Sequence, residues 1–410
     1  MALRCKKMPS KHQVMCKKIK FRSLLSFLAV ILCLSFSNAI AEELDPGFYP
    51  ALSVGYATTD NVFMSDGNER SDDALVIAPS LLYKMLFGKH SLDFTYIGEL
   101  TSFDTYSTED YNDNRADAEL LLDLTRRLDV TLDAGYMWSH ENRGVAGSRG
   151  STPRDLDTWE QGSAEAKVTY GRRTSIAQIE VSGSFLDRKY TNNRQNERDR
   201  ERAGGTIALY YNISSKTSLL LEGSYITVDY VNDASINLDS TETFSLAGVR
   251  WEATAKTTGE IKIGYHTKNM DEEYLEDFEG GSYFVSLLWE PKPYSQITLE
   301  ASRRTDEVPY DESVAVNPSY YVRDSVSVYW KHSFTEKFIS YADVAIHKVE
   351  YGGIDQTEDY FNTWFELEYR LRDWLRLGAK YKYDSRDSSA AGLDYVANTF
   401  LLKVTLVNED

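Results

Sequence analysis

The sequence predicts an all-β protein, a transmembrane antiparallel up-and-down β-barrel of about 18 strands, with about 16 as the alternative count. Three observations support this fold class: a secretory leader, period-two alternation of apolar and polar residues, and connections that alternate between short and long. The short connections are expected to be periplasmic turns, and the long ones are expected to be extracellular loops.

The first 41 residues differ from the rest of the chain. They hold eight Lys and Arg and no acid, followed by the apolar run LLSFLAVILCLSF and by Ala39-Ile40-Ala41. This order predicts a signal peptide over residues 1–41, cleaved before Glu42, with the barrel over residues 42–410. A membrane anchor is the alternative, but the apolar run is about 13 residues, short of the ~20 that a bilayer requires.

Removing the leader changes the composition. It leaves 369 residues (410 less 41), in which 37 Lys and Arg (45 less eight) stand against 63 Asp and Glu, a net charge of −26. All three cysteines (Cys5, Cys16 and Cys33) lie in the leader, so the mature chain is expected to have no disulfide and no cysteine-bound metal. A strongly acidic chain is also a poor nucleic-acid binder, since phosphate requires a basic surface.

Alternation with a period of two recurs along the whole mature chain. In SIAQIEVSGSF, for example, the apolar residues share one face of an extended segment and Gln178, Glu180 and Ser182 share the other. Such segments predict strands starting near residues 50, 73, 90, 114, 129, 158, 175, 202, 217, 242, 259, 281, 294, 320, 337, 359, 374 and 394.

The connections between these segments alternate in length. Short ones such as FGKH, ISSKT and LRDW alternate with long polar ones such as TYSTEDYNDN, RKYTNNRQNERDRE and DSRDSSAAGLD. A soluble sandwich has no reason to keep its long loops at one end, whereas an outer-membrane barrel does. A periplasmic β-sandwich or solenoid is the alternative.

The acid-rich stretch TTDNVFMSDGNERSDDALVIAPSL, residues 58–81, could suggest a calcium loop. An EF-hand register ending at Gly67 would place Val62 and Met64 where oxygen ligands are required, which excludes that motif. We therefore expect a first extracellular loop whose acids and Asn are solvated turn residues.

The N-terminal part contains an ordered set of short elements. These elements are Gly55-Tyr56, Asp60-Asn61-Val62-Phe63, Ser71-Asp72, Pro79, Asn112-Asp113 and His140 to Gly144. As a set, rather than through any one motif, they resemble a bacterial outer-membrane family named putative β-barrel porin type 2. The resemblance is strongest over residues 50–145.

The resemblance implies a function and a location. Members of this family are often linked to export of capsular or extracellular polysaccharide and to biofilm matrix. We therefore expect a Gram-negative outer-membrane protein with loops at the cell surface. Its expected partners are outer-membrane lipid and lipopolysaccharide, the barrel-assembly machinery, and polysaccharide with its export proteins. In contrast to many such barrels, the chain ends in the polar tail NED rather than in an aromatic residue.

The polar faces of the predicted strands carry the candidate functional residues. One arc is mainly acidic and another mainly basic, so an open lumen would impose a transverse field on passing solutes. The alternative is that these charges pair across neighbouring strands and form a structural network. The predicted lumen-lining residues are Asp117, Glu119, Asp123, Asp133, Lys262, Arg370, Arg372, Arg376, Lys380 and Lys382.

No catalytic motif accompanies these charges. The sequence lacks a G-x-S-x-G elbow, an H-E-x-x-H pair and nucleotide-binding glycine runs, so we expect neither an enzyme nor a bound cofactor. Two functions remain open: a porin-like barrel that passes or helps to export polar solutes such as polysaccharide, and a structural or surface-anchoring barrel with a blocked lumen. Aromatic residues in the lumen would favour the first, and Tyr321, Tyr341, Trp364 and Trp289 are the candidates.

Overall fold

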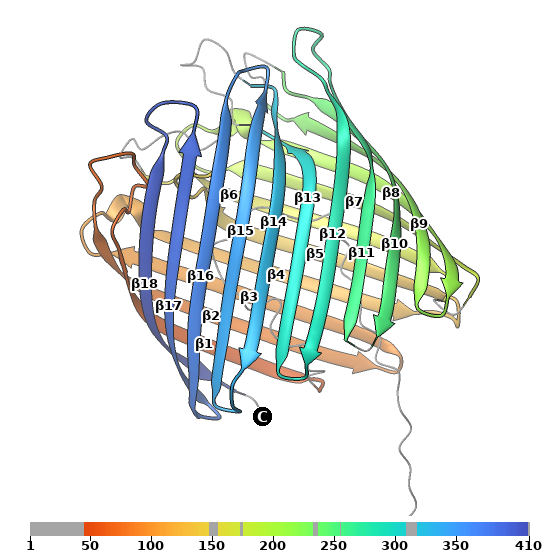
Figure 1. Cartoon of the computed structure of the whole chain (residues 1–410), viewed down its shortest axis with the longest axis horizontal. Helices are drawn as coiled ribbons and strands as arrows, with labels where there is room; N and C mark the ends of the chain where they lie inside the picture. Colours follow the sequence, from red (N-terminus) through yellow and green to blue (C-terminus); the bar gives the residue numbers. More distant parts are fainter. Residues whose placement is uncertain are drawn as a thin grey trace, which may run out of the picture. The chain divides into compact units, whose positions relative to one another are not determined.

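Eighteen antiparallel strands make up nearly all of the computed structural model, which describes residues 45–146, 155–172, 175–232, 237–254, 256–308 and 318–408 (Figure 1). The predicted signal peptide lies outside these residues. The strands are β1 (Gly47–Thr59), β2 (Asp72–Phe87), β3 (His90–Phe103), β4 (Tyr111–Asp123), β5 (Leu128–His140), β6 (Thr158–Tyr170), β7 (Ala177–Tyr190), β8 (Arg200–Ser214), β9 (Thr217–Tyr230), β10 (Ser240–Thr254), β11 (Thr257–Met270), β12 (Phe278–Lys292), β13 (Ser295–Asp306), β14 (Tyr320–Ser333), β15 (Phe338–Gly352), β16 (Thr357–Arg372), β17 (Leu375–Ser388) and β18 (Tyr395–Val407).

The strands form one closed sheet. Each strand pairs with its neighbours in sequence, and β1 pairs with β18, so the sheet has no free edge. The predicted barrel of 18 strands is confirmed. Every strand starts within three residues of its predicted position. A difference of three residues occurs at β12, for example, which starts at Phe278 rather than at residue 281.

Alternation separates the two faces of the wall. In β1, Leu52, Val54 and Tyr56 are exposed on the outside, whereas Ser53 and Gly55 between them are buried on the inside. The register pairs residues of like face in neighbouring strands, as in Val54 with Val404 of β18. The apolar positions therefore form a continuous outer surface, and the polar positions surround the lumen, the space enclosed by the wall.

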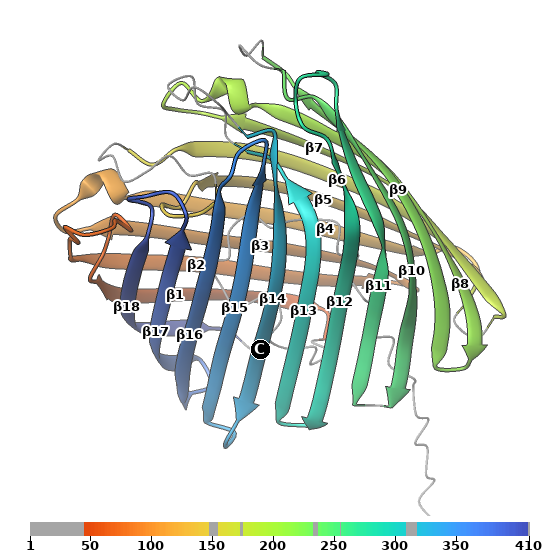
Figure 2. The same cartoon turned by 45° about the horizontal axis from the view of Figure 1, so that its top comes forward.

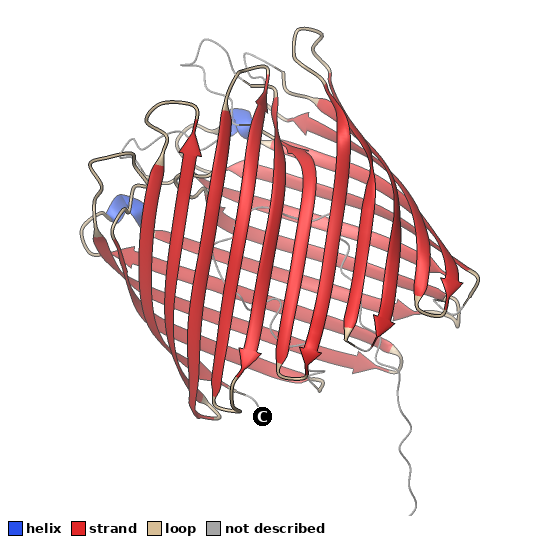
Figure 3. Ribbon diagram, in the orientation of Figure 1, coloured by secondary structure: helices blue, strands red, loops and turns tan. Residues whose placement is uncertain are grey.

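The connections differ at the two ends of the barrel. One end has tight turns, such as residues 88–89 and 215–216, and the other has longer loops, such as 60–71 and 141–157. Two of the longer loops contain short 3₁₀ helices, η1 (Ser107–Glu109) and η2 (Asn196–Arg198), visible in Figure 3. Among the described residues, no helix has the length and apolar character needed to cross a membrane.

The ends of β13 and β14 nearest the long loops tilt inward. Pairing between β12 and β13 stops at Tyr283 with Arg303, and the two strands diverge beyond that point (Figure 2). Thr305 near the end of β13 then lies against His266 of β11, inside the wall. A buried apolar cluster fills the resulting space: Leu238, Met270, Phe278, Val308, Tyr320, Tyr321, Val322, Val349 and Tyr360.

An aspartate directly before a strand closes five of the long loops. In each case its carboxylate accepts a hydrogen bond from the backbone N–H of the last residue of the preceding strand. The pairs are Asp110 with Phe103, Asp199 with Tyr190, Asp239 with Tyr230, Asp277 with Met270, and Asp394 with Ser388. These acids therefore satisfy the backbone donor at the point where strand pairing ends.

Replacing such an aspartate should destabilise the barrel. Asp277→Ala leaves the N–H of Met270 without its acceptor at 2.8 Å, and the expected cost is about 1–3 kcal/mol. The measurement is the temperature at which the folded, fast-migrating band converts to the unfolded band on gels. Asp271→Ala, which removes an exposed acid from the same loop, is the matched control and should leave that temperature unchanged. Equal shifts in both variants would contradict this role.

Candidate functional site

The inner wall is the candidate site, because it holds nearly all of the charged side chains predicted to line a lumen. By register, nine of the ten predicted residues share the inner face: Asp117, Glu119 and Asp123 of β4, Asp133 of β5, Lys262 of β11, Arg370 of β16, and Arg376, Lys380 and Lys382 of β17.

The tenth predicted residue, Arg372, does not lie in the lumen. The register between β16 and β17 shifts between Arg370 and Arg372, so alternation fails at the end of β16. Arg372 is exposed beside the turn. The prediction for this residue was wrong because a bulge before a tight turn adds a residue that the period-two pattern cannot reveal.

The acidic arc is a row of carboxylates across four neighbouring strands. The register places Asp93, Glu119, Asp133 and Glu165 directly opposite one another on β3, β4, β5 and β6. Basic side chains also reach this arc: Lys89 donates to Asp123 at 3.0 Å. Arg115 and Asp117 form an ion pair within β4; the distance from Nε to the carboxylate is 2.5 Å.

The basic arc is paired with acids of the same wall. Arg376 lies 3.5 Å from Glu368, and Lys382 lies 2.7 Å from Asp384. Glu366 forms an ion pair with Lys403 of β18 at 2.9 Å. Lys380 lies over the ring of Trp364, 4.4 Å from its centroid. This pairing favours the structural-network interpretation for β16 to β18.

A second network spans β7 to β11. Lys262 contacts both carboxylate oxygens of Glu222 at 3.0 Å and lies 3.6 Å from Glu260. Glu260 also forms an ion pair with Arg250 at 2.6 Å, and Arg250 in turn lies 3.5 Å from the carboxylate of Glu180 on β7. These partners are up to three strands apart, so strand-by-strand reading of the sequence could not find them.

The mouth at the long-loop end is narrowed from two sides. The β5–β6 loop reaches across it: the carbonyl of Gly144 accepts from Arg386 of β17 at 3.3 Å, and Ala146 packs against the buried apolar cluster. On the other side, fully buried Lys268 bridges Glu242 at 3.1 Å and Glu307 at 2.7 Å. The loop and the tilted strands therefore meet over the lumen.

Ion pairs hold the base of the β5–β6 loop. Arg143 forms a bidentate pair with Glu109 of η1, with both distances 2.6 Å. Arg198 of η2 donates to Glu141 at 2.6 Å. Burial opposes the charge of Arg198, but the carboxylate of Glu141 keeps the pKa of Arg198 above its ordinary value. The two ion pairs therefore fix the loop to the rim.

Aromatic residues face the lumen on β14 to β16. Tyr341 is buried there, and Trp364 packs against the cluster of Tyr329, Ile339 and Tyr341. Tyr321 is buried near the mouth. Trp289 lies instead on the outer face, 46% exposed, so its placement among the lumen aromatics was wrong.

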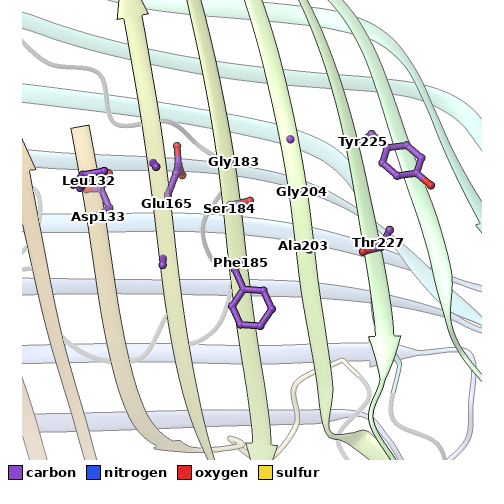
Figure 4. A pocket seen from close by; sticks show the side chains of 13 residues that line it. Leu132, Asp133, Glu165, Gly183, Ser184, Phe185, Ala203, Gly204, Tyr225 and Thr227 are labelled. Atoms are coloured by element: carbon purple, nitrogen blue, oxygen red, sulfur yellow. The ribbon is translucent and has the colours of Figure 1, made fainter. Parts of the chain in front are cut away.

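A hollow of about 690 Å³ lies along β5 to β9 (Figure 4). Its lining includes the inner acids Asp133 and Glu165, but most of it is small or apolar and belongs to the outer face. Phe185 and Tyr225 stand beside glycines and alanines there and are exposed. In a bilayer such a surface contacts lipid, so most of the hollow belongs to the outer face rather than to the charged site.

The contacts of His140, which belongs to the N-terminal motif, are structural. His140 bonds Asp113 at 2.9 Å and Asn142 at 3.0 Å, and its ring lies 4.3 Å from that of Tyr111. Among the residues that the structure describes, no group of three His, Cys, Asp or Glu is placed to hold a metal ion.

A closed antiparallel ring with an apolar outer surface and a charged interior defines a porin-like outer-membrane β-barrel. The chain belongs to the family described as Putative beta-barrel porin 2, whose model matches residues 47–408. This confirms the family that the N-terminal motifs resembled and extends the match to the end of β18.

Several solved barrels are similar in structure at low sequence identity. The siderophore receptor PiuA from Acinetobacter baumannii is 11% identical, with a TM-score of 0.47, covering 89% of this chain and 82% of that one. OpdO from Pseudomonas aeruginosa is 13% identical, with a TM-score of 0.46, covering 88% and 96%. OpdL from the same organism is 11% identical, with a TM-score of 0.43, covering 88% and 98%. No curated protein matches the sequence.

Reversing one charge of the basic arc should destabilise the barrel. In Arg376→Glu, a buried carboxylate replaces the partner of Glu368, and the expected cost is about 3–5 kcal/mol. The measurement is the urea concentration at which the folded band disappears. Arg372→Glu makes the same charge change at the exposed turn and should have little effect. Restoration by the swap Arg376→Glu with Glu368→Arg would support the pair, and an unchanged midpoint for Arg376→Glu alone would refute it.

Proposed function

We propose that this protein resides in the outer membrane and passes, or helps to export, polar solutes through its charged lumen, with capsular or extracellular polysaccharide as the substrate class. The observation that carries the proposal is the enclosure of charged rows by a wall whose outer surface is apolar. Charged groups in a wet lumen exchange hydrogen bonds with a hydrated solute, which an apolar interior could not do.

The composition of the wall supports this proposal. The acidic row of β3 to β6 and the lumen-facing Tyr341 and Trp364 offer both hydrogen-bond acceptors and ring faces. Sugars use both kinds of contact. The ion pairs of β16 to β18 would hold the wall rigid while a solute passes.

The alternative is a structural or surface-anchoring barrel with a blocked lumen. The observation that favours it is the mouth, where the β5–β6 loop contacts Arg386 and the buried apolar cluster. The two functions differ in whether the β5–β6 loop can leave Arg386 and open the mouth. A measurement of ion flow, with and without the contact, separates them.

We further propose that the tight turns face the periplasm and the long loops face the cell exterior. Cysteine at Asp66, exposed in the β1–β2 loop, should react with an impermeant maleimide on whole cells. Cysteine at Ser215, in the β8–β9 turn, should react only after the outer membrane is permeabilised. The reverse result would invert the topology, and equal labelling of both positions would contradict a membrane barrel.

Purified wild-type protein should conduct ions in a planar bilayer. Arg386→Ala removes the contact to the Gly144 carbonyl, so the loop should leave the mouth and the conductance should rise severalfold. Arg303→Ala, on the outer face of β13, is the control and should conduct like the wild type. Absence of current in all three proteins, despite correct folding, would favour the blocked barrel.

A further inference from the structure

Two arginines face each other on the inner wall near the mouth. The register pairs Arg188, close to the end of β7, directly with Arg200, the first residue of β8. Both lie on the same face as Ser184 and Gly204, which point to the lumen. Like charges placed directly opposite in a sheet repel each other, so this pair needs a compensating contact.

The contacts of these two arginines are neutral. Arg188 donates from Nε and Nη2 to the amide oxygen of Gln161, at 2.9 and 2.6 Å. Its guanidinium lies 4.2 Å from the centroid of the Trp159 ring. Arg200 donates from Nη1 to the backbone carbonyl of Arg198 at 3.2 Å. Within the described part of the chain, no carboxylate lies within 4.0 Å of either guanidinium.

Neighbouring arginines on this part of the wall differ in that respect. Arg198 is paired with Glu141 at 2.6 Å, and Arg202 is paired with Glu242 at 2.8 Å. The acids within reach are thus already used by other cations, whereas Arg188 and Arg200 keep a charge that only neutral groups contact. Both residues are half-buried, so each keeps some accessible surface.

The fixed orientation suits recognition of an oxyanion. A guanidinium presents planar donors that match carboxylate and phosphate oxygens, and such charge-assisted bonds are stronger than neutral ones. Gln161 and Trp159 hold Arg188 in place before any ligand arrives, which reduces the entropy lost on binding. An anion between the two guanidinium groups would also remove their mutual repulsion.

We propose that Arg188 and Arg200 form an anion-binding subsite in the lumen, which takes the carboxylate or phosphate groups of a passing solute. This deepens the proposed passage function and rests on it for its biological use. The substrate class is then acidic: a saccharide chain bearing uronic acid or phosphate groups, or small organic acids. The acidic row of β3 to β6 lies on the inner wall beside these two strands and would repel the same groups, so the solute would be held to one side of the lumen.

The subsite can be tested by calorimetric titration of the folded protein in detergent. The probes are sodium galacturonate for the carboxylate and inorganic phosphate for the phosphate. The wild type should bind at least one of them, and Arg188→Gln with Arg200→Gln should weaken that binding by about tenfold or more. Lys189→Gln is the matched control, because Lys189 is the next residue but lies on the outer face, paired with Asp187 at 2.6 Å.

A second variant distinguishes loss of binding from loss of folding. Arg200→Lys keeps the charge and removes the planar fork, so it should fold normally and bind the probe more weakly. Retained folded migration on gels is required of each variant. No binding by the wild type, or equal binding by the wild type and the folded double variant, would overturn the subsite.

Conductance separates this inference from the proposed function. Ion flow without probe binding would support the proposed passage function and refute the subsite. Probe binding without ion flow would support the subsite and contradict the passage. If both hold, the reversal potential in a salt gradient should shift toward cation selectivity in Arg188→Gln with Arg200→Gln, and it should not shift in Lys189→Gln.

Discussion

The pairing of β1 with β18 is the constraint on which the rest of this structure depends. Nine consecutive residue pairs join Ala51–Thr59 to Val407–Thr399, and the hydroxyls of Ser53 and Thr405 meet at 2.7 Å inside the wall. Without this seam, two strand edges would expose unpaired N–H and C=O groups to lipid, where each costs several kcal/mol. With it, every strand has two neighbours. Because the ring is closed, each strand has one face toward lipid and one toward the lumen, which is why the sequence alternates with a period of two.

Closure also explains the arrangement of charge. The charged side chains of the inner face do not contact lipid, but they lie close to one another. Most of them are therefore stable only when they are paired with an opposite charge. The networks of Lys262 and Arg250 and of Arg376 and Glu368 meet that condition across several strands. Arg188 and Arg200 are different, since amide and carbonyl oxygens hold them. Charge pairing also shapes the mouth. Buried Lys268 lies between Glu242 and Glu307 and holds the end of β13 in its inward tilt.

The sequence predicted the wall well and the site only in part. Alternation and turn spacing are local signals, so the 18 strands and the inner face of Arg376 or Asp133 could be read directly. Arg372 and Trp289 were misplaced, the first because of a register shift and the second because aromatic residues also occupy the outer surface. The acids and Asn of the first loop were interpreted as solvated turn residues, but Asn61 and Asp72 are buried, and the Asp72 carboxylate accepts hydrogen bonds from the backbone of Thr105 and Tyr106. The recurring position of an acid before a strand, as at Asp277, was a usable signal for loop closure. Arg188 and Arg200 were assigned to the loop RKYTNNRQNERDRE, because polar residues at strand ends do not differ in composition from loop residues. Contacts between distant strands, such as Arg250 with Glu180, depend on the closed ring and have no local signature.

The central claim is the closed ring, and a disulfide across its seam tests that claim most directly. Val54 of β1 faces Val404 of β18, and the cysteines of the chain all lie within residues 1–41. If the ring is closed, Val54→Cys with Val404→Cys should oxidise in membranes and join the two ends of the barrel, so that boiled, unreduced protein migrates as a compact loop. Val54→Cys with Ile77→Cys reports the β1–β2 hairpin and provides the reference for cross-linking efficiency. Efficient oxidation of the hairpin pair while the seam pair stays reduced would contradict closure and, with it, the separation of an apolar outside from a charged lumen.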